Sequence, residues 1–388
     1  MLMKKMTVSN LFQFYRTAIA IGIALLLGYI IILFTRYPSD PASFMEGMKT
    51  AFHEANEAFQ FFILGPLVRW RRGVAEFNES GFAQWMNETT PLIITGLAIS
   101  LVFSAKQFNI GAEGQLFIGA VAATFAAVHF PQIPFLHPIV VIIVAMIAGA
   151  SWAVVPGIMK AKLHASELVT SLMMNYVALF MGLFMIKTFI RDTTAGSLVS
   201  LPFAPTSRLI LINERYRLHI GIIIAVVSAF IVWWILKRTT WGYRVRLVGD
   251  NEQFAQYSGI RTRNTIFQVQ VVSGAVAGMA GTIELIGYHG RFLWLFSPGY
   301  GWDGIIIATL ARNNPLFVLL AAFFFSYIRV GAKIMGRNTD IPPEIVSILQ
   351  AAIILLVTAE AFLSRWKQRS IEKNARRMED TPKAEVQL

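Results

Sequence analysis

The stretch Lys237–Arg263, KRTTWGYRVRLVGDNEQFAQYSGIRTR, is a polar and basic interruption in an otherwise apolar chain. It carries six Lys/Arg residues against two acidic residues, and apolar segments near 218–236 and 265–288 flank it. A helix needs about 20 residues to cross the hydrocarbon core of a bilayer, so both flanks are long enough to span a membrane. Because basic residues concentrate on the cytoplasmic side, the sequence predicts a cytoplasmic loop between two transmembrane helices.

The same stretch contains a short run of helix-forming residues at 251–258. Asp250 is the expected N-cap of this helix and Gly259 its expected stop. Phe254 and Tyr257 are three residues apart, so they share one face, as in an amphipathic helix that docks into the groove of a partner protein. The alternative is a solvated loop against anionic lipid, and these residues alone leave both interpretations open.

The composition predicts an integral membrane protein. The chain has 388 residues, of which 55% are hydrophobic and 14% charged, whereas about 25% of the residues of a soluble domain are charged. The net charge of +12 comes from basic residues at the ends of apolar segments, which favours orientation in a membrane over nucleic-acid binding. The chain has no cysteine, which excludes disulfides, thiolate metal sites and cysteine nucleophiles.

The pattern predicts an all-α polytopic fold with about nine to ten transmembrane helices. Apolar segments of spanning length lie near 17–34, 89–104, 114–129, 137–158, 168–187, 218–236, 265–288, 315–335 and 345–363. Gly304–Ala311 is apolar but covers only about 12 Å as a helix, so it reaches part-way through the membrane. We expect this segment to be a half-helix.

Four segments are expected along the chain. Residues 1–35 form an N-terminal span, 36–88 an outer interfacial segment, 89–363 the membrane core, and 364–388 a basic cytoplasmic tail. Alternation of the spans from a cytoplasmic N-terminus places the loop 237–263 and the tail on the inside, which agrees with the distribution of Lys and Arg. Both termini are therefore expected in the cytoplasm.

Two glycine-rich breaks resemble each other. Phe108–Gln115, FNIGAEGQ, and Phe296–Gly304, FSPGYGWDG, each carry a carboxylate and lead into a short apolar segment, and the predicted spans enter these segments from opposite sides of the membrane. Inverted repeats of this kind bring broken helices together near the bilayer midplane, where they form the substrate site. Chance similarity between glycine-rich turns remains the alternative.

Polar and aromatic side chains at these breaks are the candidate substrate-binding residues. A charge inside the bilayer costs at least about 2.5 to 3.5 kcal/mol, so Glu113 is expected to face a cavity or a partner. Two roles stay open for it: a contact with the substrate, or a cap at the N-terminus of the next helix. Asn175 and Tyr176, in a neighbouring span, either contact the substrate or hold helices together. The complete candidate set is Phe108, Asn109, Glu113, Gln115, Asn175, Tyr176 and Trp302.

Several function classes lack their motifs. The chain contains no G-x-x-x-x-G-K-[ST] loop, so any ATP that drives it must bind to a separate chain, and we expect no cofactor on this one. Gly299–Gly304 matches G-x-G-x-x-G but precedes a truncated membrane helix instead of following a strand, so it does not indicate a dinucleotide site. No His/Asp/Glu cluster has metal-ligand spacing, and no Ser or Thr has an evident base partner, which argues against an enzyme and against a metal site.

Three motifs carry a family resemblance: Phe108–Gln115, Pro156–Tyr176 and Gly242–Ile260. With them the chain resembles permease subunits of ATP-binding-cassette importers, in the family that includes branched-chain amino acid, ribose-type sugar and nucleoside permeases. The first two motifs are most similar to the nucleoside branch, which implies nucleoside import, with simple sugars or branched-chain amino acids as alternatives. The third motif implies docking on the ATPase for Gly249, Glu252, Ala255, Tyr257 and Gly259, to which the shared helix face adds Phe254.

The resemblance also implies an assembly in the bacterial cytoplasmic membrane. Its expected members are a second permease subunit, identical or related to this chain, an ATP-binding-cassette ATPase, and an extracytoplasmic solute-binding protein. An ion- or proton-coupled secondary transporter is the rival class, since it would use the same inverted repeats with Glu113 or Asp303 as the proton carrier. ATP depletion separates the two, because only the importer depends on its ATPase.

Overall fold

The computed structural model describes residues 22–23, 25–36, 43–71, 74–163, 166–339, 341, 348, 351 and 355. The chain forms two compact units, one over Phe62–Ile334 and the other over Met1–Phe61 with Met335–Leu388. The predicted tail 364–388 and nearly all of the predicted span 345–363 lie outside the described residues, as does the first predicted span before Leu25 apart from two residues.

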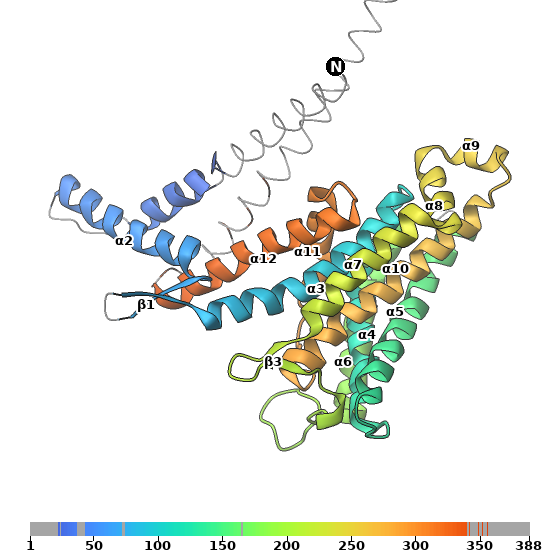
Figure 1. Cartoon of the computed structure of the whole chain (residues 1–388), viewed down its shortest axis with the longest axis horizontal. Helices are drawn as coiled ribbons and strands as arrows, with labels where there is room; N and C mark the ends of the chain where they lie inside the picture. Colours follow the sequence, from blue (N-terminus) through green and yellow to red (C-terminus); the bar gives the residue numbers. More distant parts are fainter. Residues whose placement is uncertain are drawn as a thin grey trace, which may run out of the picture. The chain divides into compact units, whose positions relative to one another are not determined.

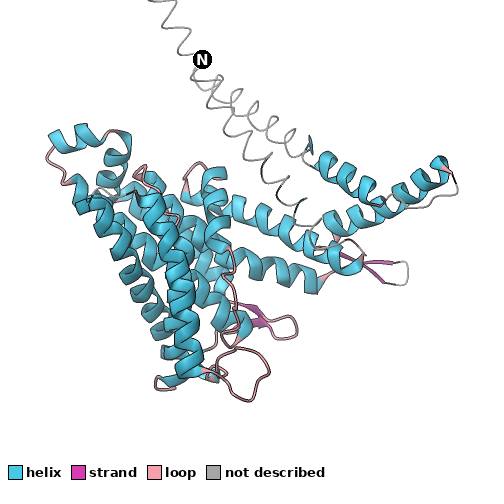
Figure 2. Cartoon of the chain, turned by 180° about the vertical axis from the view of Figure 1, so that it is seen from behind, coloured by secondary structure: helices cyan, strands magenta, loops and turns pink. Residues whose placement is uncertain are grey.

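The larger unit is a bundle of long helices with short helices and two hairpins at its ends (Figures 1 and 2). The helices are α3 (Glu79–Ser104), α4 (Ala112–His129), α5 (Leu136–Leu163), α6 (Glu167–Met185), α7 (Gly221–Arg238), α8 (Thr240–Asp250), α9 (Glu252–Tyr257), α10 (Thr262–Glu284), α11 (Tyr300–Leu310) and α12 (Pro315–Asn338). π-Helical turns extend α6 over Ile186–Ile190 and α10 over Leu285–His289. The antiparallel strand pairs are β1 (Val68–Arg71) with β2 (Val74–Phe77) and β3 (Leu211–Asn213) with β4 (Leu218–His219).

Helix lengths confirm the prediction of an all-α polytopic membrane protein. Among the described residues, six helices are long and apolar enough to cross a membrane: α3, α5, α6, α7, α10 and α12. Helix α3 begins at Glu79, before the predicted apolar span at Thr89, because hydropathy marks only the apolar part of a helix. Helix α11 has 11 residues, which confirms the predicted short helix.

Helices α3 and α10 form the centre of this unit. Their most apolar windows are 89% and 83% buried, against 22%, 22% and 28% for α5, α6 and α7. A Cβ atom on Gly278 of α10 would lie 2.4 Å from the carbonyl oxygen of Ala145 in α5, and one on Gly119 of α4 would lie 2.5 Å from the Cα of Gly278. The close approach of these helices therefore depends on glycine at both positions.

The smaller unit contains a helix at Leu25–Thr35 and most of α2 (Phe44–Leu64). The hydroxyl of Tyr29 donates to Asn56 Oδ1 at 2.9 Å, and the Arg36 guanidinium lies 3.5 Å from the Glu54 carboxylate. Ala51, Ala55 and Ala58 are buried at helical spacing on one side of α2. This helix follows the periodicity expected for an interfacial segment.

The polar stretch 237–263 folds into two short helices at one end of the bundle, α8 and α9 (Figure 1). The prediction that Asp250 caps the second helix is wrong, because α8 continues through Asp250 and the extended residue Asn251 separates the helices. Asn251 Oδ1 accepts the hydrogen bond from the Phe254 N–H at 3.0 Å. Gly259 has φ +80°, which confirms it as the stop.

Candidate functional site

Glu113, at the start of α4, connects the two glycine-rich breaks. Its Oε1 accepts hydrogen bonds from the Ser297 hydroxyl and from the Gly299 N–H, the latter at 2.7 Å. Its Oε2 accepts a hydrogen bond from the Gly301 N–H at 2.5 Å. The carboxylate is buried. The prediction that the breaks at 109–115 and 299–304 approach each other is confirmed.

The geometry around Glu113 follows from the unsatisfied N–H groups at the first turn of α11. A helix N-terminus carries free donors and partial positive charge, and a carboxylate satisfies both. Gly299 has φ +83°, and a Cβ on Gly301 would lie 2.5 Å from the Glu113 backbone nitrogen, so the approach requires glycine at both positions. In this conformation Glu113 caps α11, a helix remote in sequence, and not its own helix α4.

Asn109, Gln115 and Ser273 form a second buried polar group beside this link. Asn109 Nδ2 donates to Gln115 Oε1 and to Ser273 Oγ, both at 3.0 Å, and Gln115 Nε2 donates back to Asn109 Oδ1 at 3.3 Å. Ser273 Oγ donates in turn to the Ala98 carbonyl oxygen at 2.7 Å. A ligand reaches these amides only by replacing hydrogen bonds that the protein makes to itself.

Asn175 joins α6 to the first break. Its Oδ1 accepts from the Gly114 N–H and its Nδ2 donates to the Ile110 carbonyl oxygen, each at 2.9 Å. Of the seven candidate residues, the structure therefore brings Asn109, Glu113, Gln115 and Asn175 together at the break. The aromatic candidates Phe108, Tyr176 and Trp302 are exposed instead.

A charged cluster on α3, α11 and α12 was largely missed by the sequence prediction. Arg329 pairs with Asp303, and its Nε lies 3.5 Å from Glu88 Oε2. Lys333 pairs with the other oxygen of Glu88. The Arg329 guanidinium also lies over the Tyr300 ring, 5.1 Å from its centroid. Two carboxylates and two cations are thus linked in one chain of contacts.

The sequence contained a signal for this cluster. Arg329 and Lys333 are four residues apart inside an apolar helix, and cations within a span need carboxylate partners. Asp303 lies in the predicted break 296–304, whereas Glu88 lies immediately before the predicted span 89–104 and so outside the apolar segment.

A second polar group contacts the same region through Tyr300. The Tyr300 hydroxyl donates to Glu284 Oε1 at 2.8 Å, and His289 Nε2 lies 3.2 Å from the same oxygen.

His219 lies outside the membrane-spanning helices. Its burial, and to a smaller extent the charge of His289, lower its pKa to about 4. His219 is therefore neutral at pH 7, and its Nδ1 accepts from the Gly221 N–H at 3.1 Å.

The predicted docking residues divide into two groups. Ala255 is buried with Val248 and Ile266, and a Cβ on Gly249 would lie 2.1 Å from the Ser104 carbonyl oxygen, so both residues hold α8 and α9 against the bundle. The other members are exposed: Glu252, Phe254, Tyr257 and Gly259. Within the described residues no group of three or more His, Cys, Asp or Glu side chains is placed to hold a metal ion.

Related proteins match most of this architecture. Residues 81–358 match the family described as branched-chain amino acid transport system / permease component. The guanosine ABC transporter permease NupP of Bacillus subtilis is 35% identical over 296 residues, 74% of this chain and 83% of that protein. The nucleoside ABC transporter permease NupB of Lactococcus lactis is 35% identical over 294 residues, 72% of this chain and 80% of NupB. The glucose ABC transporter permease TsgB13 of Haloferax volcanii is 32% identical over 302 residues, 75% of this chain and 79% of TsgB13.

The same two bacteria each have a second, more distant permease. NupQ of Bacillus subtilis and NupC of Lactococcus lactis are both 25% identical to this chain over 291 residues, which is 71% of this chain and 89% and 90% of those proteins. The matched family and the membrane-spanning helices identify a transport component and not an enzyme. The chain is a multi-pass membrane protein that belongs to the permease-component family of branched-chain amino acid transport systems.

Proposed function

We propose that this chain is the permease subunit of an ATP-driven nucleoside importer. The observation that carries the proposal is the 35% identity to two nucleoside permeases over about three quarters of the chain. The family match over residues 81–358 includes both breaks. The link between α4 and α11 supports it, because broken helices joined at a polar contact are typical of transporter substrate sites.

Transport requires the broken helices to adopt two arrangements. In this conformation Glu113 occupies the free N–H groups of α11, and Asn109, Gln115 and Asn175 are satisfied within the protein. Nucleoside hydroxyls and base amides can replace such hydrogen bonds without leaving a buried group unpaired. We assign these four residues to the substrate step on that ground, and the exposed aromatics Phe108, Tyr176 and Trp302 to stacking with the base.

The energy source in this proposal is ATP bound to a separate ATPase. The exposed Phe254 and Tyr257 on α9 are the proposed contact, because Ala255 and Gly249 fix α8 and α9 to the bundle and so allow a force to pass into it. Closure of the ATPases would then shift the permease between its two arrangements.

The remaining members of the assembly follow from the same proposal. The paired permeases NupP with NupQ and NupB with NupC favour a second, related permease subunit. An extracytoplasmic binding protein delivers the nucleoside, and the complex lies in a bacterial cytoplasmic membrane with both termini of this chain inside. A simple sugar is the second candidate substrate, because TsgB13 is 32% identical to this chain.

Uptake of radiolabelled solutes tests the substrate. Cells with and without the gene receive guanosine, uridine, glucose or leucine under identical conditions. We expect deletion to abolish nucleoside accumulation and to leave glucose and leucine unchanged. Loss of glucose or leucine accumulation with intact nucleoside uptake would replace the nucleoside assignment with the corresponding alternative.

A further inference from the structure

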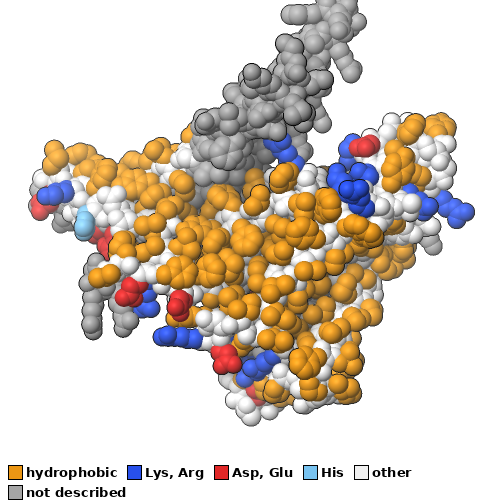
Figure 3. Space-filling model, in the orientation of Figure 1, with side chains coloured by type: hydrophobic (Ala, Val, Ile, Leu, Met, Phe, Trp, Pro, Cys, Tyr) orange, Lys and Arg blue, Asp and Glu red, His pale blue; other side chains and the backbone are white. Residues whose placement is uncertain are grey.

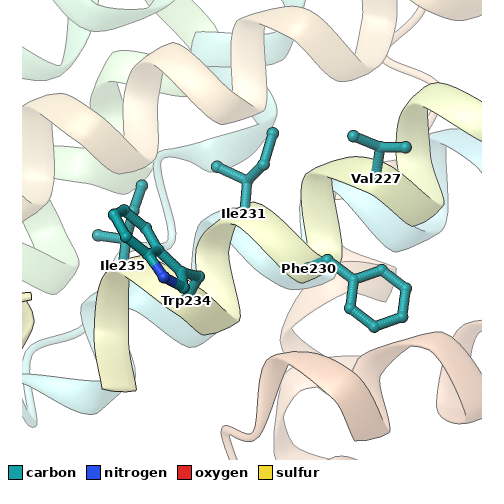
Figure 4. Close-up of a pocket in the computed structure, with 5 residues that line it drawn as sticks. All are labelled: Val227, Phe230, Ile231, Trp234 and Ile235. Carbon is teal, nitrogen blue, oxygen red and sulfur yellow. The ribbon is translucent and has the colours of Figure 1, made fainter. Parts of the chain in front are cut away.

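Three of the membrane-spanning helices present mostly apolar outer surfaces, which are interrupted by the exposed Ser151 on α5 and the exposed Tyr176 on α6. Helices α5, α6 and α7 are mostly exposed, and their Lys, Arg, Asp and Glu residues lie only in their terminal turns. Figure 4 shows five apolar side chains of α7 that line a groove of about 430 Å³: Val227, Phe230, Ile231, Trp234 and Ile235. Apolar side chains cover much of the face shown in Figure 3. Surfaces of this composition suit contact with lipid tails.

The surface of α3, α11 and α12 is different, because it carries ionised side chains. We call it the charged face and define it by Glu88, Trp302, Asp303, Arg329 and Lys333. The side chains of Glu88, Asp303, Arg329 and Lys333 are 13%, 21%, 21% and 39% exposed. Trp302 beside them is also exposed.

Arg329, which joins both carboxylates of this face, lies inside α12 and not at its end. Arg329 is about 21 Å along α12 from Pro315 at 1.5 Å per residue, in a helix of 24 residues. Lipid tails cannot solvate exposed charges, so such residues face water or polar protein. The charged face is therefore less suited to lipid than the outer surfaces of α5 and α7.

We infer that the charged face lines the solute path, opposite a second permease subunit. This inference rests on the proposed transport function and adds the location of the path and the class of solute. A second permease is the occupant that fits, because Bacillus subtilis and Lactococcus lactis each have two permeases similar to this chain. A path between two chains also supplies the water that the charges require.

The balance of charges on this face selects an uncharged solute. Glu88 pairs with both cations, and Asp303 pairs with Arg329, so the charges of these four side chains balance one another. A nucleoside can donate its hydroxyls to the carboxylates, accept from the cations and stack on Trp302. A nucleotide brings negative charge to a cluster whose cations are already paired, and it must lose hydration to enter. The face thus favours nucleosides over their phosphorylated forms.

Chemical rescue at Lys333 tests the inference, since the chain has no cysteine of its own. In the assembled transporter, Lys333→Cys should lower guanosine uptake about tenfold by leaving Glu88 short of a cation. Modification with aminoethyl methanethiosulfonate restores a positive charge and should return uptake to within about twofold of the parent chain. The sulfonatoethyl reagent adds a negative charge and should not restore uptake. Bound guanosine should slow the reaction of both reagents with the cysteine.

The matched control is Phe230→Cys, on the apolar groove of α7, which should resist both charged reagents. The inference would be overturned if the cysteine at position 333 did not react in the assembled transporter. It would also be overturned if both reagents restored uptake equally. Reaction at Phe230→Cys as fast as at Lys333→Cys would do the same. Absence of guanosine uptake by the unmodified assembly is a separate outcome, because it contradicts the proposed function and leaves the labelling pattern to decide the location of the path.

Discussion

Two polar regions of this permease lie within the membrane-spanning unit and differ in how their groups are satisfied. Around Glu113, Asn109 and Asn175 the side chains are held by hydrogen bonds to the protein itself. On the charged face, Arg329 and Lys333 are paired but remain partly exposed. The first arrangement holds two broken helices in one conformation, whereas the second keeps ionised groups at a surface. The comparison indicates that a motif rich in polar residues can be structural in one state, while a mostly apolar helix carries partly exposed charges.

The Glu113 link is expected to be the stronger constraint. Each hydrogen bond to a charged group contributes about 1.5 to 3 kcal/mol, and the carboxylate accepts from Ser297, Gly299 and Gly301. A transport step that separates α4 from α11 must provide other partners for the carboxylate and for the two N–H groups. This requirement makes the link a point at which substrate or water can control the conformation.

Removal of the carboxylate should produce the largest effect. In Glu113→Ala the N–H groups of Gly299 and Gly301 lose their partner, at about 1 to 3 kcal/mol for each buried donor. We expect guanosine uptake to fall by at least about a hundredfold and the melting temperature of the purified complex to drop. Glu113→Gln should retain part of the guanosine uptake and part of the thermal stability, since its amide oxygen still accepts one hydrogen bond.

The control for this pair is Glu214→Ala, at an exposed loop position. Full uptake by Glu113→Ala, at normal protein levels, would show that the link between the breaks has no role in transport.

The charged face should give the next largest effect. Arg329→Gln leaves Asp303 unpaired and Glu88 with one cation, while Asp303→Asn removes only one partner of Arg329. Because the two residues contact each other, the double variant should lose less uptake than the sum of the singles, with a coupling of about 0.5 to 3 kcal/mol. A double-mutant cycle on guanosine uptake measures this coupling free energy. Strictly additive losses would show that Arg329 and Asp303 do not act as a unit.

A similar contrast between buried and exposed groups applies at α9. Phe254→Ser with Tyr257→Ser alters only exposed side chains, so the complex should assemble and hydrolyse ATP while uptake falls by about tenfold or more. Ala255→Leu enlarges a buried side chain and should cost about 1 to 3 kcal/mol of stability through overpacking. Parallel measurement of ATPase rate, uptake and thermal melting separates a loss of coupling in the double serine variant from a loss of stability in Ala255→Leu. Normal coupled transport by the double serine variant would remove α9 from the ATPase contact.

The smallest effect is expected from the neutral amides. Asn109→Ala and Asn175→Ala each delete hydrogen bonds around the segment 109–115, so their effects on the melting temperature should not add. Each single variant should cost about 1 to 3 kcal/mol of stability through unsatisfied buried groups. Additive losses would mean that the two amides stabilise the break independently.

The sequence predicted local features of this fold well. Among remote contacts it predicted the approach of the two breaks but not the hydrogen bonds that join them. The short helix at 300–310 and the stop at Gly259 both follow from local composition. Capping is normally a local pattern, so the spacing around Glu113 suggested its own helix and gave no sign that the donors come from α11. The cap of α9 was misplaced by one residue, because Asp250 and Asn251 are both good caps and only the length of α8 decides between them.

The charged face escaped prediction for a related reason. An averaged hydropathy assigns a span from its apolar majority, so Arg329 and Lys333 are absorbed into an acceptable helix. Their ion-pair partners are known only from the fold, in which α3 and α11 place Glu88 and Asp303 beside them. The pairing depends on tertiary structure, and one sequence without the fold does not specify it.

The source of energy tests the central claim most directly. The permease, its partner subunit and the ATPase are reconstituted into sealed vesicles with ATP on the ATPase side, and the binding protein loaded with labelled guanosine is added on the opposite side. We predict guanosine accumulation that requires ATP, stops when ATP hydrolysis is blocked, and persists when an ionophore collapses the proton gradient. Accumulation driven by a proton gradient in the absence of ATP would contradict the account and identify a secondary transporter.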